Sequence, residues 1–147
     1  MSHSFSKNYV HAVFSTKDRQ NLIPPELEKR LYSFIASLAR EHKIPLLAAG
    51  GTPNHSHLLF LLPATISLAF AINTFKANSS RFIHERGLAF QWQNGYGAFS
   101  VGHSQLDKVV AYVRSQPEHH TRMTFEEEFL ALLKKADIPY DPKYVFG

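Results

Sequence analysis

The stretch PNHSHLLF, residues 53–60, places a turn, two histidines and an apolar run in direct succession. Pro53 and Asn54 are typical of a turn, and the residues after them predict a β-strand from His55 to Leu62. Side chains two residues apart in a strand point to the same face, so His55 and His57 share a face that Ser56 does not. Two imidazoles at this spacing can bind one metal ion, but a lone His-x-His pair is more often hydrogen-bonded to its neighbours. The pair therefore needs a third ligand and a reactive group before it indicates a catalytic site.

The segments on both sides of this strand alternate between strand and helix patterns. The expected elements are strand 9–15, helix 24–42, strand 44–49, a turn at 50–54, strand 55–62, helix 67–86, strand 90–101, and helices 105–116 and 125–135. The order β-α-β-β-α-β predicts an α+β, ferredoxin-like fold, with a four-stranded antiparallel sheet and additional C-terminal helices. This pattern places helices on one face of the sheet and leaves the other face open or covered by a partner. The length of 147 residues fits a single domain, residues 1–147.

Composition excludes several classes of protein. The chain has no cysteine, which excludes disulfides, thiolate metal sites and cysteine nucleophiles and fits a cytoplasmic location. Its longest apolar stretch, LLFLLPA, is too short to cross a bilayer, and its start lacks a signal-peptide pattern, so no membrane association is expected. The formal net charge of +4 slightly favours an anionic partner such as nucleic acid.

The segment AYVRSQ, residues 111–116, supplies candidates for the missing ligand and reactive group. Tyr112 and Gln116 are four residues apart, so they are neighbours on one face of the predicted helix. The carbonyl oxygen of Gln116 can bind a hard cation, and the hydroxyl of Tyr112 can attack phosphorus. Each residue alone is more often a packing or solvated residue; the combination with the histidine pair is more specific.

Several motifs extend the pattern over nearly the whole chain. They are YVHAVFSTKDR, PNHSHLLF, FKANSSRFI, WQNGYGAFSVG, AYVRSQPEHH and TFEEEFLALLKKADIPYDPKYV. In these motifs and their order, the sequence resembles the HUH single-tyrosine transposases of small insertion sequences, the TnpA type, together with the REP-associated tyrosine transposases. HUH stands for His-hydrophobic-His; here the middle residue is Ser56, which we expect to face away from the metal.

The resemblance implies a mechanism and partners. His55, His57 and Gln116 would bind Mg²⁺ or Mn²⁺, and Tyr112 would attack single-stranded DNA that carries hairpins. The product would be a 5′-phosphotyrosine with a free 3′-hydroxyl, which allows rejoining without ATP. The resemblance also implies a homodimer with shared active sites.

Basic residues offer candidate contacts to the DNA backbone. The candidates are Lys17, Arg19, Lys76, Arg81 and Arg114, although any single surface charge is more often only solvated. Two alternatives to a transposase remain open: a non-catalytic ferredoxin-like nucleic-acid-binding protein, such as a domesticated transposase, and a structural metal protein. Retention of the two histidines, the glutamine and the tyrosine together favours the enzyme.

Overall fold

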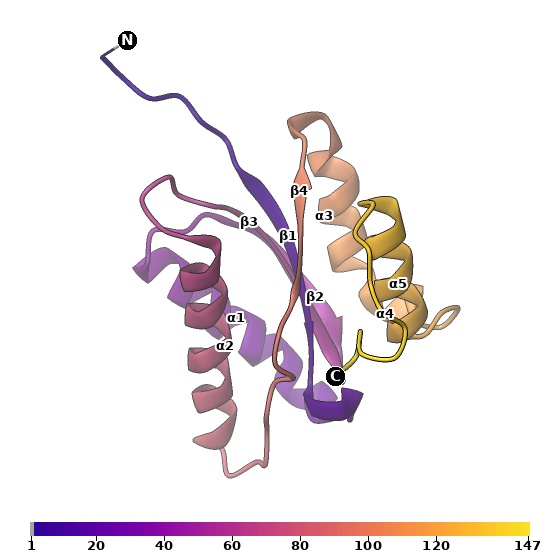
Figure 1. The fold of residues 1–147 in the computed structure, drawn as a ribbon. Helices are drawn as coiled ribbons and strands as arrows, with labels where there is room; N and C mark the ends of the chain where they lie inside the picture. Colours follow the sequence, from indigo (N-terminus) through magenta and orange to yellow (C-terminus); the bar gives the residue numbers. More distant parts are fainter. Residues whose placement is uncertain (1) are drawn as a thin grey trace.

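The computed structural model describes residues 2–147 and contains one four-stranded antiparallel sheet (Figure 1). The strands are β1 (Tyr9–Ser15), β2 (Leu46–Thr52), β3 (His55–Leu61) and β4 (Gly97–Val101), in the spatial order β2-β3-β1-β4. The helices are α1 (Pro25–Glu41), α2 (Leu68–His84), α3 (Leu106–Arg114), α4 (Gln116–His119) and α5 (Phe125–Lys135), with short 3₁₀ turns η1 (Lys17–Arg19) and η2 (His103–Gln105). The predicted α+β class and the β-α-β-β-α-β order are confirmed.

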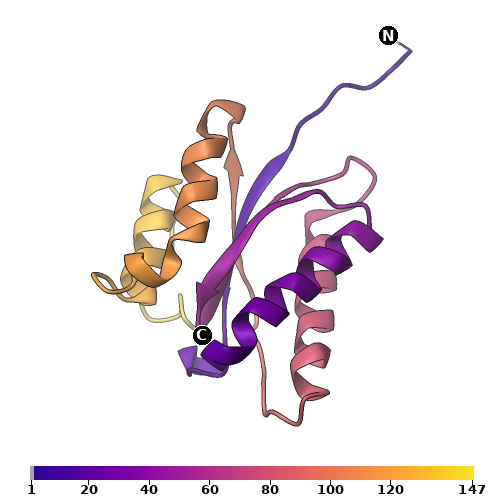
Figure 2. The same cartoon turned by 180° about the vertical axis from the view of Figure 1, so that it is seen from behind.

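One face of the sheet packs against α1 and α2, which lie together on the same side of the sheet (Figure 2). Alternate residues of the central strands supply this core, including Phe14 of β1 and Phe60 of β3, which are buried between the sheet and the helices. Pro25 occupies the first turn of α1, and the Ser67 side chain accepts a hydrogen bond from the backbone N–H of Phe70 at the start of α2. Local capping and hydrophobic spacing therefore agree with the tertiary packing.

The second face of the sheet is covered by the chain's own C-terminal helices α3, α4 and α5 (Figure 1). Val113 of α3 is fully buried against Ala48 of β2 and Leu59 of β3. The sequence pattern had left this face open or covered by a partner, because it gave no packing surface for the last helices. Their apolar stripes meet the sheet instead, so His55, His57 and Leu59 on this face of β3 are fully buried, whereas Leu61 at the end of the strand is partly exposed.

Three of the differences from the predicted element boundaries are larger changes in the path of the chain. β2 continues through Gly50 to Thr52, so the turn before β3 is only Pro53 and Asn54. Residues 90–96 do not join β4 and make only an isolated bridge between Thr16 and Trp92; the buried Trp92 side chain instead donates a hydrogen bond to Ser79. The helix that carries Tyr112 ends at Arg114, because Pro117 disfavours continuation, and Gln116 begins α4.

No helix within residues 2–147 combines the length and apolar character that crossing a membrane requires.

Gly50 sets how closely α3 approaches the sheet. It pairs with His57 across the β2–β3 ladder, and a Cβ at this position would collide with the backbone carbonyl oxygen of Val113. We expect Gly50→Ala to destabilise the protein by about 1–3 kcal/mol, since α3 must shift to relieve the overlap. Urea denaturation measures this cost. Gly102→Ala is the matched control, because a Cβ there meets no atom within 4 Å and the backbone φ of −72° suits any residue. Equal stability of both variants would contradict close packing at Gly50.

Candidate active site

The histidine pair lies on the face of β3 that α3–α5 cover. His55 and His57 are fully buried beneath these helices. Ser56 points to the other face, as predicted, and its hydroxyl lies 2.7 Å from the hydroxyl of Tyr32 on α1. The departure from a hydrophobic residue at this position is therefore accommodated by a buried hydrogen bond.

Glu128 of α5 lies at the centre of the site. Its Oε1 atom lies 3.0 Å from Nε2 of His57, 3.1 Å from Nε2 of His120 and 3.5 Å from Nε2 of His55. Its Oε2 atom accepts a hydrogen bond from the hydroxyl of Tyr112. One buried carboxylate thus joins the histidine pair to the tyrosine.

Tyr112 is held over the histidines by its position on α3. Its ring packs against those of His57, His11 and His119, with centroid distances of 5.7, 5.9 and 5.1 Å. Burial raises the pKa of Tyr112, and the adjacent Glu128 carboxylate raises it further. The tyrosine therefore keeps its proton and donates it to Glu128 in a hydrogen bond.

The short helix α4 brings in two more polar groups. Oε1 of Gln116 lies 3.0 Å from Nε2 of His55 and 3.0 Å from Nε2 of His120. Nδ1 of His120 is fixed by the backbone carbonyl of Met123 at 2.8 Å, which leaves Nε2 directed at the cluster. Although Gln116 is no longer on the helix of Tyr112, the structure brings it together with both predicted histidines.

His11 of β1 supports the cluster from the neighbouring strand. Its Nε2 atom lies 2.7 Å from Nδ1 of His57, and both side chains are buried. Such a contact fixes the orientation and tautomer of a metal-binding histidine. Phe125, one turn before Glu128, packs its ring against His55 at 4.6 Å and seals the opposite side.

Burial controls the protonation of the cluster. It lowers the pKa of His11 and of His55 to about 3, and it also lowers the pKa of His57. Burial alone would raise the pKa of Glu128, but hydrogen bonds from His57 and Tyr112 outweigh it and hold this pKa well below its usual range. Near neutral pH these shifts favour the neutral imidazoles of His11, His55 and His57 beside one carboxylate.

These shifts predict that the metal-free protein loses stability in mild acid. The unfolded chain binds protons at His11 and His55 below pH 6.5, whereas the folded chain does not bind them until the pH is about 3. The free energy of unfolding should therefore fall as the pH falls through this range, by at most about 1.4 kcal/mol per pH unit for each histidine. Urea denaturation in EDTA between about pH 7 and pH 4.5 measures the slope. His11→Gln should reduce the slope, and the exposed His103→Gln should leave it unchanged; a wild-type stability independent of pH would contradict the assignment.

The donor set of the cluster fits a metal ion. The ligand atoms of His55, His57, His120 and Glu128 all lie within 4.8 Å of one another. A tetrahedral ion with bonds near 2.1 Å requires ligand atoms about 3.4 Å apart, close to the separations around Glu128. Three imidazoles and one carboxylate could therefore bind a divalent metal with little rearrangement.

Three of these residues were missed by sequence reasoning. Glu128 and His120 belong to motifs that were noted without an assigned role, and His11 was placed only in the first strand. A signal for Glu128 exists in the sequence, because it lies on the same apolar stripe of the last helix as Phe125 and Leu132. A carboxylate on a buried stripe needs partners, and here the partners are the histidines.

The predicted DNA-binding residues do not gather in one place. Lys76 donates to the backbone carbonyls of Gln93 and Gly95, at 2.8 and 2.9 Å, and Arg19 donates to the carbonyl of Phe146 at 3.0 Å. The remaining candidates lie in η1, on α2 and at the end of α3: Lys17, Arg81 and Arg114. Lys76 and Arg81 are on α2, which packs on the face of the sheet opposite Tyr112 (Figure 1).

Comparison with known families gives one match that covers most of the chain. Residues 4–116 match the family described as transposase, IS200-like. The matched region includes the histidine pair, Tyr112 and Gln116, and it ends before His120 and Glu128. The sequence matches none of the curated proteins with which it was compared.

Two solved structures share the fold. One is a candidate transposase from Deinococcus radiodurans R1, with a TM-score of 0.62 and 17% identity over 77% of this chain and 92% of that chain. The other is a REP-associated tyrosine transposase bound to a REP hairpin, with a TM-score of 0.62 and 17% identity over 100% of this chain and 95% of that chain.

Proposed function

The chain belongs to the family of IS200-like transposases, and from this premise we propose that it is a metal-dependent transposase of single-stranded DNA with Tyr112 as nucleophile. The observation that carries the proposal is the convergence on Glu128: one carboxylate contacts the tyrosine hydroxyl through Oε2 and the histidines through Oε1. A tyrosine fixed beside a set of neutral imidazoles is suited to nucleophilic attack at a phosphodiester.

We propose that His55, His57, His120 and Glu128 hold the metal, with the Gln116 oxygen beside them. A divalent ion would offset the charge of the scissile phosphate and polarise its phosphorus. The three imidazoles favour Mn²⁺ or a later transition metal over Mg²⁺, which prefers oxygen ligands. When His57 uses Nε2 as a ligand, its proton is carried on Nδ1, where Nε2 of His11 lies within 2.7 Å to accept it.

The residues of the chain account for the remaining chemistry. The oxygen of Tyr112 forms a bond to phosphorus as its proton passes to Oε2 of Glu128. The bond from phosphorus to the 3′ oxygen breaks, and the 3′ oxygen takes a proton from water and leaves as a hydroxyl. Glu128 orients the hydroxyl before attack. The 5′-phosphotyrosine conserves the bond energy, so the same step in reverse rejoins a strand.

Single-stranded DNA with a hairpin is the proposed substrate. The support is family membership together with the fold shared with a protein solved with a REP hairpin. Because Tyr112 already contacts Glu128 within one chain, we propose that each tyrosine acts in its own chain. The homodimer implied by the resemblance stays a prediction.

The test is formation of a covalent complex with DNA. Labelled single strands that contain the hairpins flanking the gene are incubated with Mn²⁺, with Mg²⁺ or with EDTA and separated on a denaturing gel. We expect a protein–DNA band with metal, strongest with Mn²⁺, and none with EDTA. Tight hairpin binding without this band, in protein shown to contain metal, would favour the non-catalytic nucleic-acid-binding alternative.

A further inference from the structure

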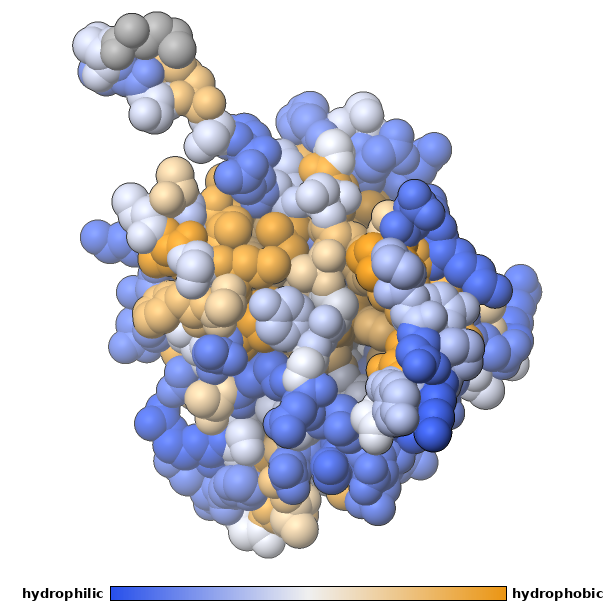
Figure 3. Space-filling view, viewed as in Figure 1, coloured by the Kyte–Doolittle hydropathy of each residue, from blue (hydrophilic) through white to orange (hydrophobic). Residues whose placement is uncertain are grey.

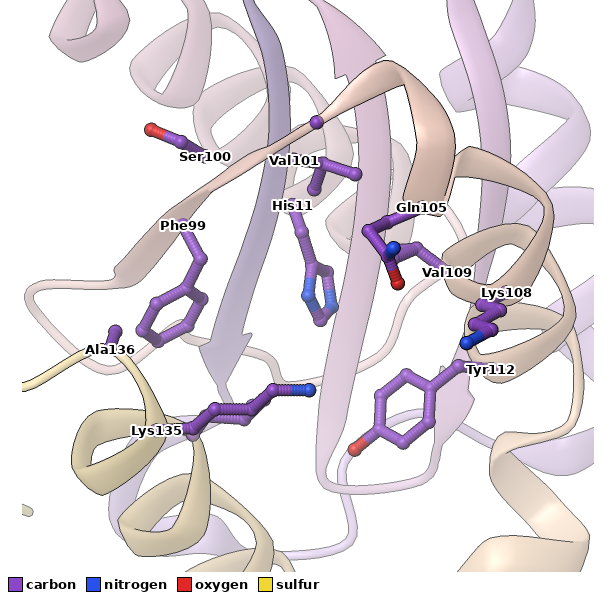
Figure 4. Close-up of a pocket in the computed structure, with 12 residues that line it drawn as sticks. His11, Phe99, Ser100, Val101, Gln105, Lys108, Val109, Tyr112, Lys135 and Ala136 are labelled. Carbon is purple, nitrogen blue, oxygen red and sulfur yellow. The ribbon is translucent and has the colours of Figure 1, made fainter.

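A cavity of about 510 Å³ opens beside Tyr112 (Figure 4). It lies between β4, α3 and α5, and Tyr112 and His11 form part of its wall. This volume is within the range of small-molecule sites, roughly 300–1,000 Å³. Figure 3 shows hydrophobic surface between β4 and α5, bordered by hydrophilic residues.

Two lysines give the cavity its charge. Lys108 comes from α3 and Lys135 from α5, and Figure 4 shows the ammonium end of Lys135 directed into the cavity toward Tyr112. Within residues 2–147 neither ammonium makes an ion pair or a hydrogen bond, and no carboxylate lines the cavity. Among the described residues, the cavity therefore presents two lysines without a carboxylate partner of their own beside the tyrosine.

The walls of the cavity are largely apolar. Phe99 and Val101 of β4 face Val109 of α3 and Leu132 of α5 across it. Phe99 lies near His11, with ring centroids 6.1 Å apart, and is only partly buried. Aromatic and aliphatic side chains of this kind form stacking surfaces for unpaired bases.

We propose that this cavity, the flank pocket, binds the nucleotide adjacent to the phosphate that Tyr112 attacks. Lys108 and Lys135 contact phosphates of the strand, and the base lies against Phe99 and Val109. The inference rests on the proposed function, since it takes single-stranded DNA as the substrate. It places the DNA strand against the wall of this cavity. None of the five basic residues that the sequence predicted to contact DNA lines the cavity.

Binding is measured without cleavage, so that the flank pocket is tested apart from the chemistry. The probe is a fluorescent single-stranded oligothymidylate, and all variants carry Tyr112→Phe. Removing two phosphate contacts with Lys108→Ala and Lys135→Ala should lower the slope of log affinity against log salt by about 1.4. Lys134→Ala is the matched control, because this exposed lysine precedes Lys135 on α5 but does not line the cavity.

The aromatic wall is tested with the same probe. Phe99→Ala should weaken binding by about 5- to 150-fold through loss of base stacking. Phe70→Ala, an exposed aromatic on α2 and on the other face of the sheet, should leave binding unchanged. Thermal melting identifies unfolded variants, and Phe99→Leu replaces Phe99→Ala if the latter does not fold.

The outcomes separate the two proposals. Equal effects of Lys134→Ala and Lys135→Ala, unchanged binding in the double lysine variant, or no binding of the probe would each overturn the flank pocket. If covalent complexes form nonetheless, the proposed function stands. Selective loss in the pocket variants without any covalent complex would retain the pocket as a strand-binding site and reject the nuclease chemistry.

Discussion

Tyr112→Phe is expected to abolish the covalent protein–DNA complex, with a loss of at least about 10⁴-fold in rate, and to leave binding of the same strand nearly unchanged. The substitution removes only the hydroxyl oxygen, while the ring can keep its packing against His11 and His57. Glu128 loses one donor but keeps its contacts with His57 and His120. Denaturing gels measure the complex, and fluorescence anisotropy measures binding.

Tyr96→Phe is the control for this substitution, because Tyr96 is exposed in the segment before β4 and does not contact the cluster. It should form the complex at the wild-type rate. A complex that persists in Tyr112→Phe would place the nucleophile elsewhere. Mixing Tyr112→Phe chains with His57→Ala chains then tests action within one chain: we expect no activity, whereas recovery would show that sites are shared between chains.

Glu128→Gln is expected to weaken Mn²⁺ binding by at least about 100-fold. The amide keeps the size of the side chain but removes the charge that faces three histidines. Isothermal titration calorimetry gives the affinity directly. Thermal and urea denaturation give a second readout: at 100 times the wild-type Kd, Mn²⁺ should add about 2.7 kcal/mol to the wild-type free energy of unfolding and only about 0.4 kcal/mol to that of the variant.

Glu126→Gln is the matched control on the same helix. Glu126 is partly exposed and makes only a 3.8 Å surface pair with Arg19, so its loss should leave Mn²⁺ affinity unchanged. If Glu128→Gln binds Mn²⁺ as tightly as the wild type, the carboxylate is not a ligand. The metal would then be held by the histidine pair and Gln116, the set that the resemblance implied.

The fold was largely predictable because local patterns and tertiary contacts agree. β1 and α5 have the predicted limits, and α5 begins with a capping box in which Thr124 and Glu127 exchange hydrogen bonds. The fourth strand is shorter than predicted, because Gly95 adopts a φ of 87° and the carbonyls of Gln93 and Gly95 bond to Lys76 of α2. Lys76 precedes Gln93 by 17 positions and Gly95 by 19 positions. Strand periodicity does not predict contacts across such separations.

The candidate site was predictable only in part. The spacing of His55 and His57 fixes their common face, and the segment from Tyr112 to Gln116 lies beside them as expected from the resemblance. Glu128 is 71 residues from His57, and neither helix nor strand periodicity connects positions so far apart. Only the packing of α5 against the sheet shows that the Glu128 carboxylate contacts both the histidines and Tyr112. The same packing of α5 forms one wall of the flank pocket.

The residues of the cluster come from elements between the first strand, β1, and the last helix, α5. They are therefore added to the chain at different times during synthesis. At roughly 5–20 residues per second, the 16 residues from Val113 to Glu128 take the ribosome about one to three seconds to add. Throughout that interval the growing chain carries the histidine pair and the tyrosine without the carboxylate that joins them. Deletion of α5 would leave a finished molecule in this incomplete arrangement. A complete site therefore requires that α5 has been synthesised and is part of the chain.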